Sequence, residues 1–455
     1  MSQLERMEWQ RLLSTRRFKV SQGTVKETRT PATEEGSPGL RTDFHIDHDR
    51  VVFSSAFRRL GRKTQVHPLA RHDHTHNRLT HSVEVASVGR SLGNRVGMMM
   101  QHAQILPEGY TPHDIGAVVQ VACLAHDIGN PPFGHTGEDA LRDWFRQPKN
   151  APFLAPLSDA ERRDIQTYEG NAHSLRMVGS LEMYAGEGGM RLTSAAIGTL
   201  IKYPWTSDAQ PALGRDKFNI YRAELPYFQR VADEMGLIQR DEHVWARHPL
   251  SYLMEAADDI CYAILDLEDA VEIGILDVRE FESLFAGFAE FERVWQTDDV
   301  RQKCAMLRGI AVGRCVSEVA DKFMLHHDSL LSGTFPGKDL IDACTPVIQQ
   351  SLIKAKDLAS NKVYRHHTKV VTELAAYPCL AVLLDALVPA VFTLHTGGPD
   401  ALSPREQRAL GLMENGAQVQ PSLYAAYMRI LDFLGAMTDN YAANLARDIS
   451  GVGIL

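Results

Sequence analysis

Ionisable side chains stand on the apolar faces of predicted helices, and this feature limits how the chain can fold. His81 lies in line with Val85 and Val88 in one predicted helix, and His126 follows Val119 at helical spacing in another. A lone histidine on such a face is more often a satisfied core residue, but a buried polar group without a partner is costly. We therefore expect these helices to meet where their polar side chains share a partner.

A third predicted helix carries two adjacent carboxylates, Asp258 and Asp259, and spacing alone leaves open which of them faces inward. Asp258 shares a face with Cys261 and Leu265. One histidine, a His–Asp pair and a distant aspartate make a ligand set of nitrogen and oxygen with no thiolate. Such a set suits a divalent ion with open water positions better than a closed structural zinc site. A metal held this way can bind a phosphate ester and activate a water molecule.

The His–Asp dipeptide occurs five times, so its context must identify the relevant copy. His126-Asp127 ends an apolar helical stretch, and Gly129 with the Pro131-Pro132 pair predicts that the helix stops there. Neighbouring helical residues point about 100° apart, so both side chains reach one ion only if the helix ends or distorts. The other copies are His48-Asp49, His72-Asp73, His113-Asp114 and His327-Asp328.

Two longer strings carry a family resemblance. Residues 126–138 (HDIGNPPFGHTGE) and 255–262 (EAADDICY) resemble the HD-domain deoxynucleoside triphosphate triphosphohydrolases of the dGTPase type. The eukaryotic SAM-and-HD-domain dNTPases are more distant relatives. The resemblance covers most of the chain in the expected order and implies metal ligands at His81, His126, Asp127 and Asp258. Further matching segments are residues 47–60, 202–204 and 364–366, whereas residues 72–76 depart from the pattern by their many histidines.

The resemblance also implies that His135 and Glu138 handle a proton beside the scissile phosphate. They are three residues apart, so one helical turn would bring them together. A carboxylate beside an imidazole holds its tautomer and raises its basicity. The alternatives are a loop-capping histidine and an ordinary first-turn carboxylate. The sequence leaves open whether His135 acts as an acid or as a base.

Substrate contacts are expected on the same helix as Asp258. Tyr262 and Asp266 follow it at four-residue steps, and the resemblance implies that both meet the deoxyribose, with the 3′-hydroxyl on Asp266. A core tyrosine and a solvated aspartate are the alternative. No phosphate-binding glycine loop of either common type is present, so the triphosphate must be bound by the metal and by side chains. Arg78, one turn before His81, is the best-placed fork for phosphate. Other candidates are Arg58, Arg59, Arg62, Lys63, Lys202 and Arg365.

Long helical patterns follow one another with few alternating strand patterns. We therefore expect an all-α, mostly helical fold, with an HD-domain helical core and additional C-terminal helices. Residues 1–40 are expected to form an N-terminal arm, residues 41–334 the catalytic core, and residues 335–455 a C-terminal helical subdomain packed on that core.

Charge and cysteine usage limit the partners and the compartment. The formal net charge of −9 does not indicate a nucleic-acid-binding surface. Six scattered cysteines without C-x-x-C spacing, and no signal segment, favour the cytoplasm. The longest apolar run, residues 379–394, contains Asp385 and Pro389 and is expected to be too short to span a membrane.

We therefore expect a metal-dependent enzyme that uses Mn²⁺, Mg²⁺ or a similar divalent ion. It would hydrolyse a dNTP, with dGTP a candidate preference, to the deoxynucleoside and inorganic triphosphate. The resemblance also implies a homo-oligomer and leaves room for a nucleotide or single-stranded DNA effector. One alternative is an HD phosphohydrolase acting on nucleoside monophosphates or cyclic nucleotides. Another is a non-catalytic nucleotide or single-stranded DNA sensor, which the intact pair His135 and Glu138 disfavours. The preferred base, the native metal and the oligomeric state stay open.

Overall fold

Helices make up most of the structure, as the sequence predicts. The computed structural model describes residues 5–21, 24–28, 41–64, 76–183, 188–288, 294, 296–365 and 367–452. In these ranges the named strands form two small antiparallel sheets. β1 (Arg17–Ser21) pairs with β2 (Thr24–Thr28), and β3 (Gln239–Asp241) pairs with β4 (Val244–Trp245). The expectation of a mostly helical chain is confirmed.

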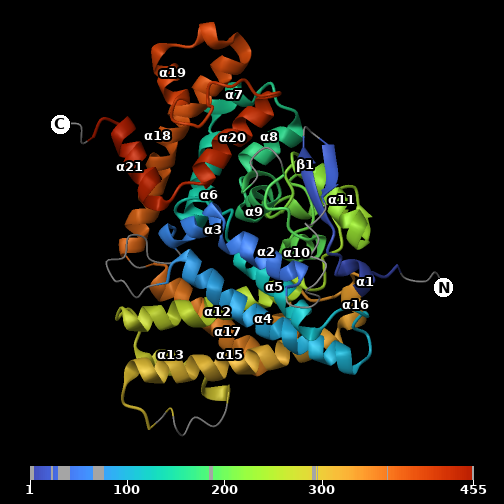
Figure 1. Ribbon diagram of the computed structural model, residues 1–455. Coiled ribbons are helices and arrows are strands. Elements are labelled where there is room, and N and C mark those ends of the chain that lie inside the picture. Colours follow the sequence, from blue (N-terminus) through green and yellow to red (C-terminus); the bar gives the residue numbers. More distant parts are fainter. Residues whose placement is uncertain are drawn as a thin grey trace.

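A layer of long helices positions the predicted ligands. α4 (Arg78–His102), α12 (Ser251–Glu272), α15 (Val300–Leu325) and α17 (Pro346–Leu358) lie side by side in the lower half of Figure 1. α5 (Pro112–Ala125) crosses behind them and packs along α4. Asn77 caps α4, because its side chain accepts hydrogen bonds from two backbone N–H groups of the first turn.

Glycine lets α4 and α5 approach closely. A Cβ atom at Gly93 in α4 would lie 2.7 Å from the Cα of Gly116 in α5. A Cβ atom at Gly116 would lie 2.1 Å from the Oδ1 of Asn94. A larger residue at Gly93 would require the two helices to shift, and one at Gly116 would displace the side chain of Asn94. This close contact brings the start of α4, with His81, toward the end of α5, with His126.

The remaining helices surround this layer. On the N-terminal side they are α1 (Trp9–Leu12), α2 (Asp43–Val52) and α3 (Ser55–Arg59). The middle of the chain adds α6 (Gly134–Arg146), α7 (Ala151–Leu154), α8 (Asp159–Gln166), α9 (Gly170–Arg176), α10 (Ser194–Leu200), α11 (Leu225–Met235) and α13 (Val278–Leu284). The last part adds α16 (His327–Leu331), α18 (His367–Gly397), α19 (Pro404–Leu410), α20 (Leu423–Gly435) and α21 (Asp439–Ile449).

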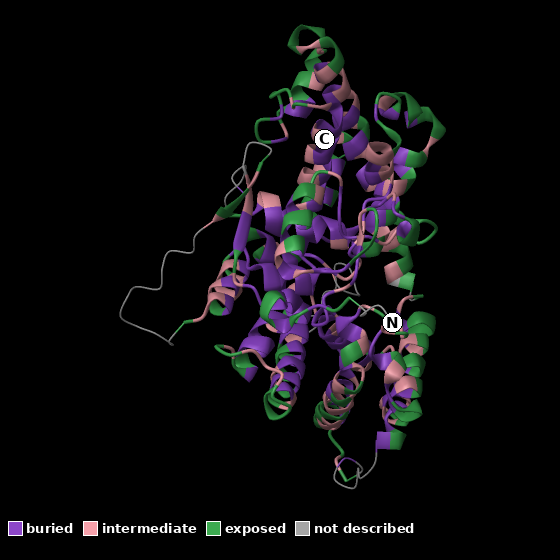
Figure 2. Ribbon diagram, turned by 90° about the vertical axis from the view of Figure 1, so that its right-hand side faces the viewer, coloured by how far each residue is buried: buried purple, intermediate pink, exposed green. Residues whose placement is uncertain are grey.

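Two hydrophobic clusters form the core, and Figure 2 shows buried residues through the middle of the molecule. The first cluster contains side chains of α4, α5, α12, α15 and α17. The second contains side chains of α6, α7 and α8 together with α18 to α21. The loop between α5 and α6, residues 126–133, therefore passes from one cluster to the other. The division at residues 40 and 334 stays a prediction.

Part of the segment expected to be an arm is packed into the body. Trp9 and Leu12 of α1 and Phe18 of β1 are buried in the first cluster. Arg17 is 1% exposed and pairs with Asp47, which is fully buried. The buried guanidinium also donates to the backbone oxygen of Arg191, which fastens the hairpin to the middle of the chain.

α18 corrects one expectation from the sequence. The structure continues the helix through Pro378 and Pro389, so it is longer than the apolar run suggested. Among the described helices it alone is long and apolar enough to cross a membrane, by length and composition only. However, 44% of the apolar window is buried inside the protein, and the carboxylate of Asp385 accepts a hydrogen bond from Trp144. A core helix passes the same test, so this is weak evidence for a membrane span.

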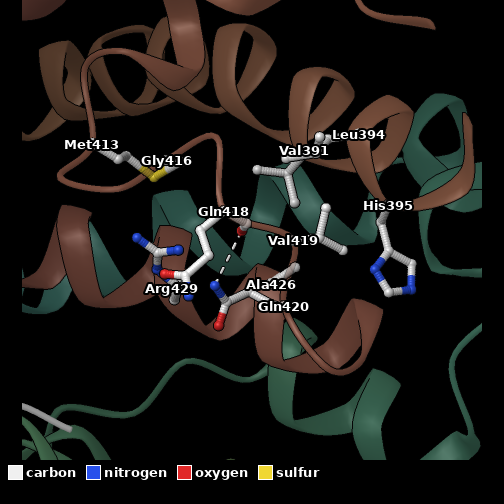
Figure 3. A pocket seen from close by; sticks show the side chains of 10 residues that line it. All are labelled: Val391, Leu394, His395, Met413, Gly416, Gln418, Val419, Gln420, Ala426 and Arg429. Carbon is white, nitrogen blue, oxygen red and sulfur yellow. Dashed lines mark hydrogen bonds between the residues drawn. The ribbon is translucent and has the colours of Figure 1, made fainter. Parts of the chain in front are cut away.

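A small cavity lies in the second cluster, between α18, α20 and the chain that joins α19 to α20 (Figure 3). Val391 and Leu394 line one side, and Val419 and Ala426 line another. Its water-accessible space is about 10 Å³, which is room for about one water molecule. No residue that lines it is a predicted site residue.

Candidate metal centre and active site

The predicted ligands meet where α5 ends. α5 begins at Pro112 with a capping box between Thr111 and Asp114. It runs as an apolar helix to Ala125, and His126 is its C-cap residue. The predicted break at this point is confirmed.

Three of the predicted ligands form one cluster. His81, His126 and Asp127 each offer a ligand atom, and these atoms all lie within 4.8 Å of one another. Asp258 joins them from α12, since its Oδ1 lies 3.0 Å from the Nε2 of His81 and 3.6 Å from the Nε2 of His126. Asp259 instead pairs with Lys356, at 2.8 Å. Of the two adjacent carboxylates, Asp258 is the one that faces the histidines.

The ring of His126 has the orientation that a metal ligand needs. Its Nδ1 lies 2.6 Å from the backbone oxygen of Cys123. A carbonyl oxygen can only accept, so Nδ1 carries a proton and Nε2 is the nitrogen that faces Asp127 and Asp258. Nε2 is therefore the atom that would bind a metal ion once it has lost its own proton. This donor set of imidazole nitrogens and carboxylate oxygens fits a divalent ion of the hard or borderline type.

The electrostatics of the cluster agree with a site built for positive charge. Burial opposes the charged imidazole, but Asp127 and Asp258 raise the pKa of His126 to about 9. Burial also opposes the charged carboxylate, but Arg78, His126 and His81 lower the pKa of Asp127 to about 2. The carboxylates therefore stay ionised in a buried place, where a cation would stabilise them.

Arg78 contacts the cluster of candidate metal ligands through Asp127. Its Nη1 donates to the Oδ2 of Asp127 at 2.8 Å, and the side-chain amide of Asn130 donates to the Oδ1. The Nε of Arg78 is buried and has no partner among the described residues. The Nη2 lies close to Gly134, where a Cβ atom would come within 2.5 Å of it. Arg78 thus connects the cluster to the residue that precedes His135.

His135 and Glu138 lie at the start of α6 as a hydrogen-bonded pair. The Nδ1 of His135 is 3.0 Å from the Oε2 of Glu138. The histidine side chain is 78% exposed, whereas the glutamate side chain is 3% exposed. The other oxygen of Glu138 accepts a hydrogen bond from the backbone N–H of Gly170 at 2.7 Å. The carboxylate accepts from Nδ1, so the exposed Nε2 is free to exchange a proton.

Charges around this pair favour an ionised glutamate. Burial would raise the pKa of Glu138, but His135, Lys217 and Arg142 lower it to about 2. The hydrogen bond and charge of Glu138 in turn raise the pKa of His135. Lys217 and Arg142 had no role in the sequence analysis. Arg142 follows Glu138 at the i,i+4 spacing of helix neighbours, which is a local signal. Nothing in the local sequence marks the distant Lys217 as a neighbour of Glu138.

The predicted sugar contacts share the inward face of α12. Asp266 is buried, and its Oδ2 accepts a hydrogen bond from the hydroxyl of Tyr364 at 2.6 Å. The rings of Tyr262 and Tyr364 are 5.9 Å apart between centroids. Burial raises the pKa of Asp266 to about 6. Lys369 lies over the ring of Tyr364, at 3.8 Å from its centroid. Neither Tyr364 nor Lys369 was assigned a role from the sequence.

The cationic side chains predicted to bind phosphate differ in their exposure and in their partners. The Nζ of Lys202 lies 2.9 Å from the Oε1 of Glu255, one helical turn before Asp258. Arg365 is exposed on the turn that precedes α18. Lys63 is buried, and its Nζ donates to the backbone oxygens of Asn130 and Gly435. Arg59 pairs with Glu182, and Arg58 and Arg62 are exposed.

The remaining His–Asp dipeptides lie elsewhere. The Nε2 of His327 accepts a hydrogen bond from the indole of Trp9. His113 is exposed, and His48 lies 3.5 Å from Asp49. The pair at residues 72 and 73, like His366, lies outside the described residues. Among the described copies, His126-Asp127 belongs to the metal-ligand cluster and the others do not.

Comparison with known proteins places the chain in a family. The HD domain family model matches residues 78–165, which contain His81, the His126-Asp127 pair and His135. The chain is 43% identical over 454 residues to a deoxyguanosinetriphosphate triphosphohydrolase-like protein of Pseudomonas aeruginosa strain PAO1, with 98% of this chain and 99% of the relative covered. A Synechocystis protein with the same name is 33% identical over 465 residues, covering 98% of this chain and all of the relative.

A relative without the suffix "like" is more distant. The deoxyguanosinetriphosphate triphosphohydrolase of Klebsiella pneumoniae strain 342 is 33% identical over 414 residues, with 79% of each chain covered. The resemblance read from the sequence is thereby confirmed. The chain belongs to the deoxyguanosinetriphosphate triphosphohydrolase-like family of HD-domain proteins.

Proposed function

We propose that this protein is a metal-dependent triphosphohydrolase that converts a deoxynucleoside triphosphate into the deoxynucleoside and inorganic triphosphate. The observation that carries the proposal is an exposed histidine, His135, which is hydrogen-bonded to a buried glutamate at the start of α6. The loop that leads into α6 begins at the cluster of candidate metal ligands. The name of the Klebsiella relative, a deoxyguanosinetriphosphate triphosphohydrolase, makes dGTP the first substrate to test.

The proposed ligands of Mn²⁺, Mg²⁺ or a similar ion are His81, His126, Asp127 and Asp258. When bound, such an ion supplies Lewis-acid stabilisation of a phosphate oxygen and lowers the pKa of a bound water. The four side chains come from α4, α12 and the end of α5, so the helical layer itself would hold them in place. Rigid elements are the supports that a precise site requires.

His135 is proposed to handle the proton of the reaction, with Glu138 holding its ring. The oxygen of water would form a bond to the α-phosphorus while the bond from phosphorus to the 5′-oxygen breaks. Water loses a proton, and the 5′-oxygen gains one to become the hydroxyl of the deoxynucleoside. The Nε2 of His135 could accept the first proton as a base or deliver the second as an acid.

The substrate contacts are proposed in two groups. Tyr262 and Asp266 would meet the deoxyribose, since both lie on the face of α12 that carries Asp258. Arg78, Lys202 and Arg365 would contact the phosphates. Arg78 is the one whose Nε lacks a partner among the described residues while its guanidinium already contacts Asp127.

The setting of the enzyme is proposed from less direct observations. All six cysteines are free thiols, which suits a reducing cytoplasm. The homo-oligomeric state and the nucleotide or single-stranded DNA effector stay predictions from the family resemblance.

The decisive experiment is product analysis. The purified protein is incubated with each of the four dNTPs, the four NTPs, dGMP and a cyclic nucleotide, with Mn²⁺ or Mg²⁺, and the products are separated by chromatography. We expect deoxynucleoside and triphosphate in equal amounts. His135→Ala tests the site, and His113→Ala serves as its control, because His113 is an exposed histidine at the start of α5 that lies outside the metal-ligand cluster.

Other products would point to the alternatives. Hydrolysis of dGMP or of the cyclic nucleotide, with dNTPs left intact, would move the protein to the other HD phosphohydrolases. Binding of dNTPs without any turnover would favour a sensor. Release of pyrophosphate or single phosphates from a dNTP would contradict attack at the α-phosphorus with loss of the 5′-oxygen.

A further inference from the structure

The backbone takes an unfavourable path immediately before His135. Phe133 has φ +66° and ψ 13°, in the left-handed region that residues with a side chain rarely adopt. Gly134, with φ +59°, continues in the same region at no steric cost. The direction in which His135 leaves the loop depends on these two residues. A conformation of this kind persists only where the surroundings fix it.

A carboxylate from α21 fixes the backbone conformation of Phe133. The Oδ1 of Asp439 accepts a hydrogen bond from the backbone N–H of Phe133 at 2.9 Å. Its Oδ2 accepts from the backbone N–H of Thr64 at 2.9 Å and from the Thr64 hydroxyl at 2.6 Å. Asp439 is 3% exposed and stands in the first turn of α21, after the cap residue Thr438. Both oxygens are therefore used, and water is largely excluded from them.

The residue before Thr64 contacts the loop between Asp127 and His135 at a second point. Lys63, next to Thr64, is 2% exposed, and its Nζ donates to the backbone oxygens of Asn130 and Gly435. Gly435 is the last residue of α20, and Asn130 donates in turn to the carboxylate of Asp127. The loop between Asp127 and His135 is thus tied at two points to the ends of α20 and α21.

We propose that Asp439 is a positioning residue of the active site. By holding Phe133 in its left-handed conformation, this carboxylate sets the place of His135 relative to the metal ligands. The C-terminal helices would then complete the active site although they contribute no group to the reaction. The kinetic part of this inference rests on the proposed function, whereas its structural part does not.

Asp439→Asn and Asp439→Ala test the proposal in the full-length protein with its metal bound. Asparagine keeps the size of the side chain but turns one acceptor into a donor, so one of the two connections is lost. Because displacement of a catalytic group by about 1 Å can cost on the order of 100-fold, we expect kcat to fall about 10- to 100-fold. KM for the dNTP should stay within about threefold, and the bound metal should be unchanged. Asp448→Asn, on the exposed side of the same helix, is the matched control.

A second variant separates positioning from loss of stability. Glycine adopts the left-handed region freely, so Phe133→Gly removes the need for a carboxylate that enforces it. We expect Asp439→Ala with Phe133→Gly to recover a large part of the kcat that Asp439→Ala loses. A residue that merely stabilised the fold would not show this recovery, because removing a phenylalanine side chain that packs against the second cluster lowers stability further.

Hydrogen–deuterium exchange gives a readout without turnover. In Asp439→Ala, peptides that cover residues 128–138 should exchange faster than in the parent, and peptides from α4 and α12 should not. If the parent hydrolyses no dNTP, the proposed function fails while this measurement still tests the positioning. Unchanged kcat in both Asp439 variants, or unchanged exchange across residues 128–138, would overturn the proposal. So would a loss of kcat that follows the loss of bound metal and is not restored by Phe133→Gly.

Discussion

At the scale of single residues, the proposed metal site is tested most directly at His126 and Asp127, which follow each other where α5 ends. We expect His126→Ala and Asp127→Ala each to lose the bound ion and all measurable turnover, because each removes a ligand from a cluster that is largely closed to solvent. His113→Ala should keep both. Elemental analysis of the purified variants measures the ion directly. Full metal content in both ligand variants would refute the assignment.

The proposed proton transfer would use the exposed ring of His135, which the buried carboxylate of Glu138 holds in place. His135→Ala should lower kcat by about 10²- to 10⁴-fold, the usual contribution of an acid–base group, while metal and dNTP binding persist. Glu138→Ala should lower it less, since Glu138 orients the ring. Steady-state kinetics beside metal analysis check both. A kcat within a few-fold of the parent for His135→Ala would make this histidine a structural residue.

The pH dependence gives an independent test of the same pair. The hydrogen bond and negative charge of Glu138 raise the pKa of His135. Replacing Glu138 with glutamine removes the charge, so the pKa of His135 should fall toward its ordinary value. The limb of the pH–kcat profile that reports His135 should therefore move to lower pH. This sign holds whether the neutral ring acts as a base on the acidic limb or the protonated ring acts as an acid on the basic limb. A shift to higher pH would contradict the assignment.

At the scale of elements, the inward face of α12 should govern the choice of sugar. Tyr262 and Asp266 lie beyond Asp258 on this face, and Tyr364, from the segment before α18, donates a hydrogen bond to Asp266. Sites that hydrogen-bond or exclude a hydroxyl discriminate strongly between substrates. We expect kcat/KM for dGTP to exceed that for GTP by a large factor, and Tyr262→Ala should narrow the gap. Equal kcat/KM for the two nucleotides in the parent would contradict this role.

What the sequence could predict also depends on the element. The break after α5 was predictable because an apolar helical stretch meets a glycine and two prolines within a few residues. The inward placement of His81 followed from the apolar stripe of α4. In contrast, the bonds of Tyr364 to Asp266 and of Asp439 to Phe133 join residues 98 and 306 positions apart. No local pattern encodes such pairs, so they depend on how the helices are assembled.

At the scale of the whole molecule, contacts between residues far apart in the chain also explain why the structure of the N-terminal segment was not predicted. Its turn-rich composition predicted an arm, yet it forms a hairpin whose exposed strand β2 has no clean alternation of apolar and polar residues. In addition to the apolar contact of Phe18, the buried Arg17 of this hairpin pairs with Asp47 and Asp43. A buried ion pair of this kind is not visible as hydrophobic periodicity.

This ion pair yields a prediction for the stability of the whole chain. Removing one partner of a buried pair leaves an unpaired charge and typically costs about 3–5 kcal/mol. Arg17→Met should therefore lower the urea midpoint strongly, because Asp47 would remain charged without its guanidinium. Burial also raises the pKa of Asp47, and Arg17 opposes that rise, so the variant should regain some stability when the pH is lowered and Asp47 takes up a proton.

Arg16→Met is the matched control. Arg16 is the neighbouring residue, and its side chain is 53% exposed, so its pairs with Glu27 and Glu234 should contribute little to stability. The double variant Arg17→Met with Asp47→Leu should be more stable than Arg17→Met alone, because it removes the orphaned charge as well as its partner. Urea unfolding followed by circular dichroism measures all four proteins. If Arg17→Met unfolds at the same urea concentration as Arg16→Met, the hairpin is held by its apolar contacts and not by the buried charge.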